Sequence, residues 1–141
     1  MPNKIARYEE LFSHKDDRRD LVEITNSDVD FPIVQVKYMD MKQDSLLGSH
    51  YHHENYFEIY TAPSGNVVFL VEDMKTLDNE LIELEPGFRL IIPPLVPHAA
   101  VARKDSFLIG MTSQKYVSEE VNSVPYTFKG LNIPKEFIRN F

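Results

Sequence analysis

Four histidines and one glutamate are the residues of this sequence whose types and spacing point most clearly to chemistry. His50, His52, His53 and Glu58 lie in the segment GSHYHHENYFE, and His98 lies in IPPLVPHAAVA. In a strand, residues two apart project from one face, so His50 and His52 point the same way. Two such imidazoles, joined by one from a distant strand and by a carboxylate, form a shell that suits a first-row divalent metal. The pattern predicts a metal site formed by His50, His52, Glu58 and His98.

Each of these residues also has a purely structural interpretation. An H-x-H pair is common on solvated strands, and His98, which follows a proline, also suits a turn. Glu58 is more informative, because a buried carboxylate in an apolar strand is costly unless it pairs or binds a metal. His53 and Glu54 fit a polar loop better than ligand positions, and His14 lies in a charged stretch that we expect at the surface.

The elements that must position these residues are predicted to be strands. Side chains alternate with a period of two between turn residues such as Ala62-Pro63-Ser64-Gly65 and Glu85-Pro86-Gly87. The strands are predicted at 33–41, 57–61, 66–72, 80–84, 88–92, 98–102 and 107–112. Many short strands without helical patterns between them indicate an all-β antiparallel sandwich or barrel rather than a parallel α/β sheet.

Both ends of the chain are predicted to carry short helices. Residues 3–20 place Ile5, Tyr8, Leu11 and Phe12 at helix-like offsets among charged residues. Residues 131–141 offer Pro134 as a helix start, followed by an apolar edge. The predicted organisation is therefore an arm at 1–30, a β-barrel at 31–128 and a docking segment at 129–141.

Composition excludes several classes of function. The 141 residues contain no cysteine, so disulfides, thiol nucleophiles and Cys-ligated metals are absent, and any metal must use His, carboxylate or amide ligands. A formal charge of -7 argues against binding to nucleic acid. No apolar run is long enough to span a membrane, and the first residues lack a secretory signal. We therefore expect one cytoplasmic domain that binds a small molecule and neither nucleic acid nor a membrane.

The segment HYHHENYFEIYTAPSG resembles the first signature motif of the cupin superfamily. That motif is H-x-H, a gap of three or four residues, Glu, six residues and Gly. Its places are taken here by His50, His52, Glu58 and Gly65, but the gap before Glu58 is five residues, and Asp44 replaces a leading glycine. An alternative register takes His53 as the second histidine, which puts Tyr51 in the place of the first.

The segment EPGFRLIIPPLVPH resembles the second cupin motif. The matching residues are Pro86, Gly87, Pro93 and His98, whereas Leu95 replaces a glycine and Ala102 an asparagine. The resemblance covers residues 44–102 and implies a double-stranded β-helix, or jelly-roll barrel. It also implies that His50, His52, Glu58 and His98 are the ligands of a divalent ion, and this ligand set is compatible with zinc, iron, nickel or manganese.

Within the superfamily, the sequence is most similar to small cupins of nucleotide-sugar and capsular polysaccharide biosynthesis. These include ketoisomerases of dTDP-keto-deoxyhexoses and the cupin domain of a capsule epimerase. The order of an HYHH segment, an IPP-x-x-x-H segment and an aromatic end is repeated at 48–53, 92–98 and 115–128. Leu47 departs from this pattern, because those enzymes generally place an arginine there, which can pair with phosphate.

The resemblance implies isomerisation or epimerisation of a sugar or nucleotide sugar. A metal can polarise a carbonyl, and an imidazole can then remove the adjacent proton. In metal-free members of the group, the H-x-H imidazoles act as acid and base. The expected catalytic residues are thus His50, His52 and Tyr60. The expected substrate contacts are Gln35, Lys37 and Tyr56.

Two other functions remain open at this point. A sugar-sensing cupin would use the same landmarks without turnover, although a DNA-binding regulator would also need a helix-turn-helix region. An iron-dependent dioxygenase would use the same ligands with open coordination positions. For any of these functions we expect a homodimer, with apolar surface supplied by Ile5–Phe12, Ile33–Val36 and Phe137–Phe141.

Overall fold

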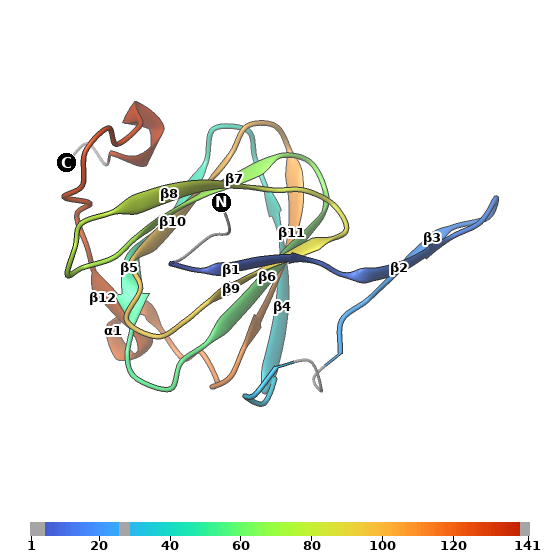
Figure 1. The fold of residues 1–141 in the computed structure, drawn as a ribbon, viewed down its shortest axis with the longest axis horizontal. Helices are drawn as coiled ribbons and strands as arrows, with labels where there is room; N and C mark the ends of the chain where they lie inside the picture. Colours follow the sequence, from blue (N-terminus) through green and yellow to red (C-terminus); the bar gives the residue numbers. More distant parts are fainter. Residues whose placement is uncertain (1–4, 26–28, 139–141) are drawn as a thin grey trace.

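Two five-stranded antiparallel sheets face each other and form the body of the protein (Figure 1). The computed structural model describes residues 5–25 and 29–138. The first sheet has the order β1-β9-β6-β11-β4, with bounds Arg7–Glu10, Phe88–Ile92, Glu58–Ser64, Ser106–Thr112 and Gln35–Met41. The second has the order β12-β5-β10-β7-β8, with bounds Ser123–Pro125, Leu46–His52, His98–Ala102, Val67–Glu72 and Asn79–Leu84. The all-β prediction is confirmed.

The core lies between the two sheets. Period-two alternation sends Tyr60 inward to pack with Phe69 and Leu90, whereas its neighbour Ile59 packs on the outer face of the first sheet with Phe31. The strands 88–92 and 98–102 begin and end as predicted. The other predicted strands are present with shifted ends, because turn residues mark a boundary only approximately.

The predicted N-terminal helix is wrong, because the described part of that arm forms strands. β1 pairs with β9 in the first sheet, and β2 (Phe12–Lys15) pairs with β3 (Asp20–Glu23) as a hairpin that projects from the body (Figure 1). Ile5 still packs against the core and Leu11 is buried, as apolar residues of a helix would be. The backbone pairing with β9, which lies far along the chain, overrides the local helical pattern.

The C-terminal segment forms one short turn rather than a longer helix. The 3-10 turn η2 covers Lys135–Phe137 after Pro134, and Phe137 is buried against the outer face of the second sheet. Residues 139–141, and with them Phe141, lie outside the described residues. An unpredicted helical turn, α1, covers Glu119–Asn122 and begins at the N-cap Ser118.

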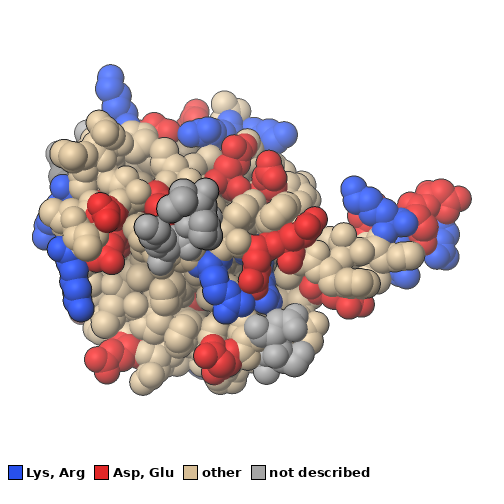
Figure 2. Space-filling view, viewed as in Figure 1, with Lys and Arg blue, Asp and Glu red and all other residues tan. Residues whose placement is uncertain are grey.

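The surface carries mixed charge. Figure 2 shows acidic and basic side chains interspersed over the visible face and along the projecting hairpin. The hairpin end carries both signs, with an ion pair between Arg18 and Asp16. Within the described ranges, no helix is both long enough and apolar enough to cross a membrane.

Candidate active site

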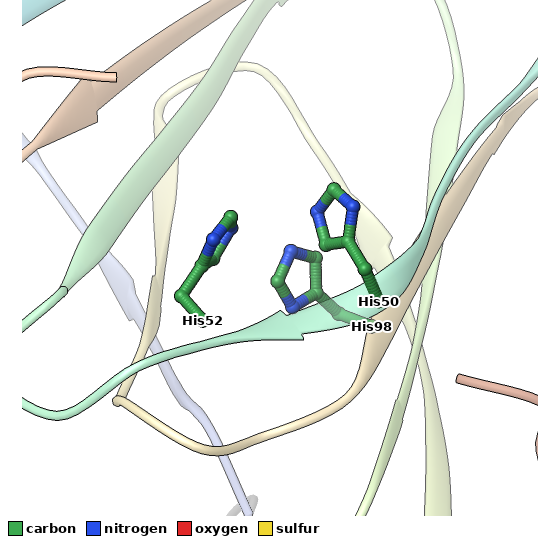
Figure 3. Close-up of side chains that lie close together, drawn as sticks. All are labelled: His50, His52 and His98. Carbon is green, nitrogen blue, oxygen red and sulfur yellow. The ribbon is translucent and has the colours of Figure 1, made fainter. Parts of the chain in front are cut away.

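Three of the histidines singled out in the sequence converge between the sheets (Figure 3). The ring centroid of His50 lies 4.7 Å from that of His52 and 4.9 Å from that of His98. The pairing of β5 with β10 causes this proximity, because His98 stands opposite His50 in the register. His52 and His98 are buried, and His50 is nearly so.

Gly48 allows β5 to approach β10 closely beside this cluster. Its φ is +85°, and a Cβ there would lie 2.8 Å from the carbonyl oxygen of His98 and 3.1 Å from Cα of Ala99. The pairing of the two strands shifts register between His98 and Ala99. A side chain at position 48 would therefore push the two strands apart next to the histidines.

Glu58 begins β6 and points its carboxylate at two of the imidazoles. Its Oε1 lies 3.0 Å from Nε2 of His52 and 2.9 Å from Nε2 of His98. Tyr60 donates a hydrogen bond of 2.5 Å to the other oxygen, Oε2. The five-residue gap before Glu58 is taken up by a turn, in which Tyr56 N bonds to the carbonyl of His53. His53 is exposed, so the alternative register is wrong.

The contacts around Oε1 of Glu58 do not have hydrogen-bond geometry. Within the described part of the chain, Glu58 Oε1, His52 Nε2 and His98 Nε2 are all buried without a hydrogen bond of acceptable angle. Buried polar atoms are seldom left in this way. The carboxylate oxygen lies about 3 Å from each of the two ring nitrogens, which is the spacing of neighbouring ligands around one ion.

The other ring nitrogen of each histidine is tied to an oxygen. Nδ1 of His52 lies 2.9 Å from the carbonyl of Asn122, and Nδ1 of His98 lies 2.9 Å from the carbonyl of Val96. Nδ1 of His50 lies 3.1 Å from the Glu119 carboxylate. Carbonyl and carboxylate oxygens only accept, so each neutral ring carries its proton on Nδ1 and keeps a lone pair on Nε2. Metal-binding histidines are typically oriented in this manner.

These observations fit a divalent ion. The ligand atoms of His50, His52 and His98 lie within 4.8 Å of one another, so the three residues can hold a metal. The buried Oε1 of Glu58 adds a carboxylate oxygen beside two of them. Nitrogen and oxygen donors of this kind suit zinc, iron, nickel or manganese.

Burial and mutual proximity also set the charges of these groups. Burial lowers the pKa of His50 to about 4, helped by the neighbouring His98 and His52 rings. Burial alone would lower the pKa of His98, but the Glu58 carboxylate raises it overall. Burial alone would raise the pKa of Glu58, yet His98 and His52 hold it well below its usual range. At neutral pH, His50 is therefore a neutral imidazole beside an ionised carboxylate.

The histidines open onto a cavity of about 170 Å³. Its wall also contains Lys37, Leu47, Tyr60, Tyr116 and Glu119. The ammonium of Lys37 lies 4.4 Å from the ring centroid of Tyr116.

Two of the predicted substrate contacts do not line this cavity. Tyr56 is buried behind it with its ring 4.2 Å from that of His52. Gln35 accepts a hydrogen bond from the backbone of Tyr116. Both residues thus support cavity-lining side chains, whereas Lys37 and Tyr60 reach the cavity itself.

Three residues of the site were missed from the sequence. Tyr116, Glu119 and Asn122 come from the segment that follows β11. The only local signal was Ser118 followed by Glu119 and Glu120, which is typical of a helix start. That signal indicates a turn of helix but contains nothing that places it over the histidines.

The two facing sheets with a histidine cluster between them define a cupin-like fold, as the sequence motifs predicted. No protein-family model and no curated protein matches the sequence. Solved structures of nucleotide-sugar enzymes do match the fold. The sugar 3,4-ketoisomerase QdtA from Thermoanaerobacterium thermosaccharolyticum, in complex with TDP, has a TM-score of 0.75 and 22% identity, covering 85% of this chain and 87% of that one.

Two further enzymes show the same similarity. The TDP-fucose-3,4-ketoisomerase WlaRA from Campylobacter jejuni has a TM-score of 0.71 and 22% identity, covering 84% of this chain and 87% of its own. The 3'-monoepimerase ChmJ from Streptomyces bikiniensis, in complex with dTDP-quinovose, has a TM-score of 0.76 and 18% identity, covering 86% of this chain and 70% of its own. The predicted structural resemblance to cupin-type enzymes of nucleotide-sugar biosynthesis is therefore confirmed at the level of the fold.

Proposed function

We propose that this protein is a metal-binding cupin that isomerises or epimerises a sugar or nucleotide sugar by proton abstraction next to a carbonyl. One observation carries the proposal: His52 Nε2, His98 Nε2 and Glu58 Oε1 meet in a buried site without hydrogen bonds of acceptable angle. Further support comes from the ketoisomerases and the epimerase that share the fold.

The ion would be held by His50, His52, Glu58 and His98. When bound, it would supply a positive charge that stabilises the oxyanion formed as a proton leaves the neighbouring carbon. Tyr60 fixes the carboxylate from the opposite side through its bond to Oε2. Backbone and side-chain oxygens fix the Nδ1 atoms of the rings.

His50 is the best candidate for the proton-accepting group. Its ring is neutral, and the proton on Nδ1 faces Glu119, so the lone pair is on Nε2. His52 and His98 direct their Nε2 atoms at Glu58. One nitrogen lone pair can bind either a proton or an ion, so His50 serves as a base only while its Nε2 is not coordinated. In an ion-free site, His50 would act as the base, and His52 would act as the acid once its Nε2 also carries a proton.

The cavity favours a substrate whose reacting part is a single sugar ring. At about 170 Å³ it is smaller than a typical pocket for a whole nucleotide sugar. A nucleotide portion would therefore lie outside the cavity. Lys37 and Tyr60 are the cavity-lining residues that can contact sugar hydroxyls.

The test is deuterium exchange into a keto sugar. The purified protein, analysed for its metal content, is incubated in deuterium oxide with dTDP-keto-deoxyhexoses and with free keto sugars. Loss of the proton next to the carbonyl is then followed by NMR. We expect exchange that is lost in His50→Asn and retained in His53→Asn, an exposed neighbour. Binding without exchange would contradict the proposal and indicate a sensor, and oxygen consumption with ferrous iron would indicate a dioxygenase.

We also propose that the protein works as a homodimer. On β4 and just before it, Val34, Val36 and Tyr38 point outward and are exposed, although Lys37 between them points into the cavity. Phe12 on the projecting hairpin is also exposed. An exposed apolar edge strand is a surface that proteins normally cover. By contrast, Leu11 and Phe137 from the expected interface segments are buried within the chain.

A further inference from the structure

One segment, residues 115–123, contacts two of the three histidines, and we call it the strap. It begins shortly after β11, which ends at Thr112, and runs through α1 into the first residue of β12. Its Glu119 carboxylate accepts from Nδ1 of His50, and its Asn122 carbonyl accepts from Nδ1 of His52. The hydroxyl of Ser123 lies 3.2 Å from the same His52 nitrogen. Pairing of β12 with β5 sets this alignment, because Ser123 stands opposite His52.

The side chain of Asn122 holds the strap in shape. Its Oδ1 accepts hydrogen bonds from the backbone N–H of Val117 at 2.6 Å and of Ser118 at 3.1 Å. Its Nδ2 lies 3.4 Å from the carbonyl of Lys115. Asn122 is buried, so removing this amide would leave several polar groups without partners. The backbone carbonyl that orients His52 belongs to the same residue.

We propose that Asn122 is a positioning residue that fixes, through the strap, which nitrogen of His50 and of His52 carries the proton. The catalytic consequence rests on the proposed function, but the positioning itself does not. Without Asn122, the strap loses its internal bonds, and the oxygens of Glu119 and Asn122 move away from the two rings. Each ring can then place its proton on Nε2, where no lone pair remains for an ion or a substrate proton.

His98 provides an internal reference for this proposal. Its Nδ1 is held by the carbonyl of Val96, two residues away in its own strand connection. The strap supplies no hydrogen-bond partner to His98 among the described residues. If the tautomers of His50 and His52 change while that of His98 does not, the strap has loosened. If all three change, the whole site has loosened.

The experiment is a long-range nitrogen–proton correlation spectrum of the imidazoles in isotope-labelled protein, which distinguishes the two neutral tautomers. In the unaltered, ion-free protein, at a pH alkaline enough to leave His98 neutral despite its raised pKa, we expect all three rings in the Nδ1–H form. In Asn122→Ala we expect His50 and His52 each to become a mixture of the two tautomers, while His98 stays in the Nδ1–H form. Asn122→Asp, which keeps an oxygen acceptor for Val117 and Ser118, should restore the original spectrum. Val121→Ala is the matched control, because this side chain is exposed on the same turn.

Zinc titration gives a second readout. We expect Asn122→Ala to weaken zinc binding by about 10- to 100-fold, as loss of an orienting group typically does. If Asn122→Ala does not fold, Glu119→Ala carries the test, since its exposed carboxylate accepts from His50, whereas the Nδ1 partner of His52 is the Asn122 carbonyl. That variant should change the tautomer of His50 alone. Unchanged His50 and His52 tautomers in a folded variant would overturn the proposal, whether or not the protein shows isomerase activity.

Discussion

The carboxylate of Glu58 lies 2.9 Å from Nε2 of His98, and the two groups are buried without a hydrogen bond of acceptable angle between them. This arrangement uses strands from both sheets, because Glu58 begins β6 and His98 begins β10. Together with His52, the pair defines the point at which an ion would be held.

The first prediction concerns the charge of Glu58. Glu58→Gln keeps the shape of the side chain but removes the negative charge that faces His52 and His98. We expect zinc affinity to fall by more than about 10-fold, measured by titration against a chelating indicator. Glu54→Gln, an exposed change in the adjoining turn, should leave the affinity unaltered. Equal affinities in the two variants would remove Glu58 from the ligand set.

A second prediction concerns Gly48, where β5 meets β10. Gly48→Ala combines an unfavourable φ with a Cβ that would lie 2.8 Å from a backbone oxygen. We expect a loss of about 1 to 3 kcal/mol in the free energy of unfolding, measured in urea. Gly87→Ala is the matched control, because its φ is +88° and its Cβ would meet no atom within 4 Å. The difference between the two losses in unfolding free energy therefore measures the cost of a side chain between the closely spaced strands. Losses of the same size would show that this close approach contributes nothing.

The third prediction concerns acid stability and the docking of β1. Burial would raise the pKa of Glu9, but hydrogen bonds from Arg7 and Arg89 lower it overall below its ordinary 4.5. Because the folded-state pKa is the lower one, ionised Glu9 stabilises the fold above pH 4.5. That contribution is lost as the pH falls through the depressed value.

Urea unfolding at a series of acidic pH values measures this contribution. Glu9→Gln should flatten the decline of stability over that range, whereas Glu10→Gln, at the exposed next position, should follow the unaltered protein. A decline in Glu9→Gln as steep as in the unaltered chain would show that the link between β1 and β9 is not electrostatic.

The fourth prediction concerns association. Val36 and Tyr38 are 62% and 72% exposed on the outer face of β4. Light scattering at micromolar concentration should give the mass of a dimer for the unaltered chain and of a monomer for the double variant Val36→Glu and Tyr38→Glu, because charge on an apolar interface is costly to bury. Leu131→Glu, at a more exposed apolar residue elsewhere, is the control. A monomeric unaltered protein would exclude the proposed homodimer.

Most of the barrel was predictable because its strands have local signatures. The turn residues Glu85-Pro86-Gly87 and 93–97 indicated the strands 88–92 and 98–102 with their bounds. The N-terminal arm was not predictable in this way. Ile5, Tyr8 and Leu11 have helix-like spacing, and only the pairing with β9 reveals that they belong to an extended segment. Such pairing depends on residues far along the chain, which a local pattern does not contain.

The candidate site likewise contains residues that the sequence identifies and residues that it does not. His50, His52, Glu58 and His98 were identifiable because imidazoles and carboxylates are chemically distinctive and fit the cupin spacing. Asn122 was not identifiable, since it orients His52 through a backbone carbonyl, a group that every residue possesses. Its role follows from the position of the strap over β5, which is a property of the assembled sheet.

The strap also connects the wall of the cavity with the groups that orient two of the histidines. Tyr116 and Glu119 form part of the cavity wall, and the same segment holds the rings of His50 and His52. Were the strap displaced, the rings of His50 and His52 would lose their Nδ1 partners together, while His98 would keep the carbonyl of Val96. A displacement of the strap would therefore alter the cavity wall and the orientation of both rings in one step, which couples access to the cavity with the readiness of its histidines.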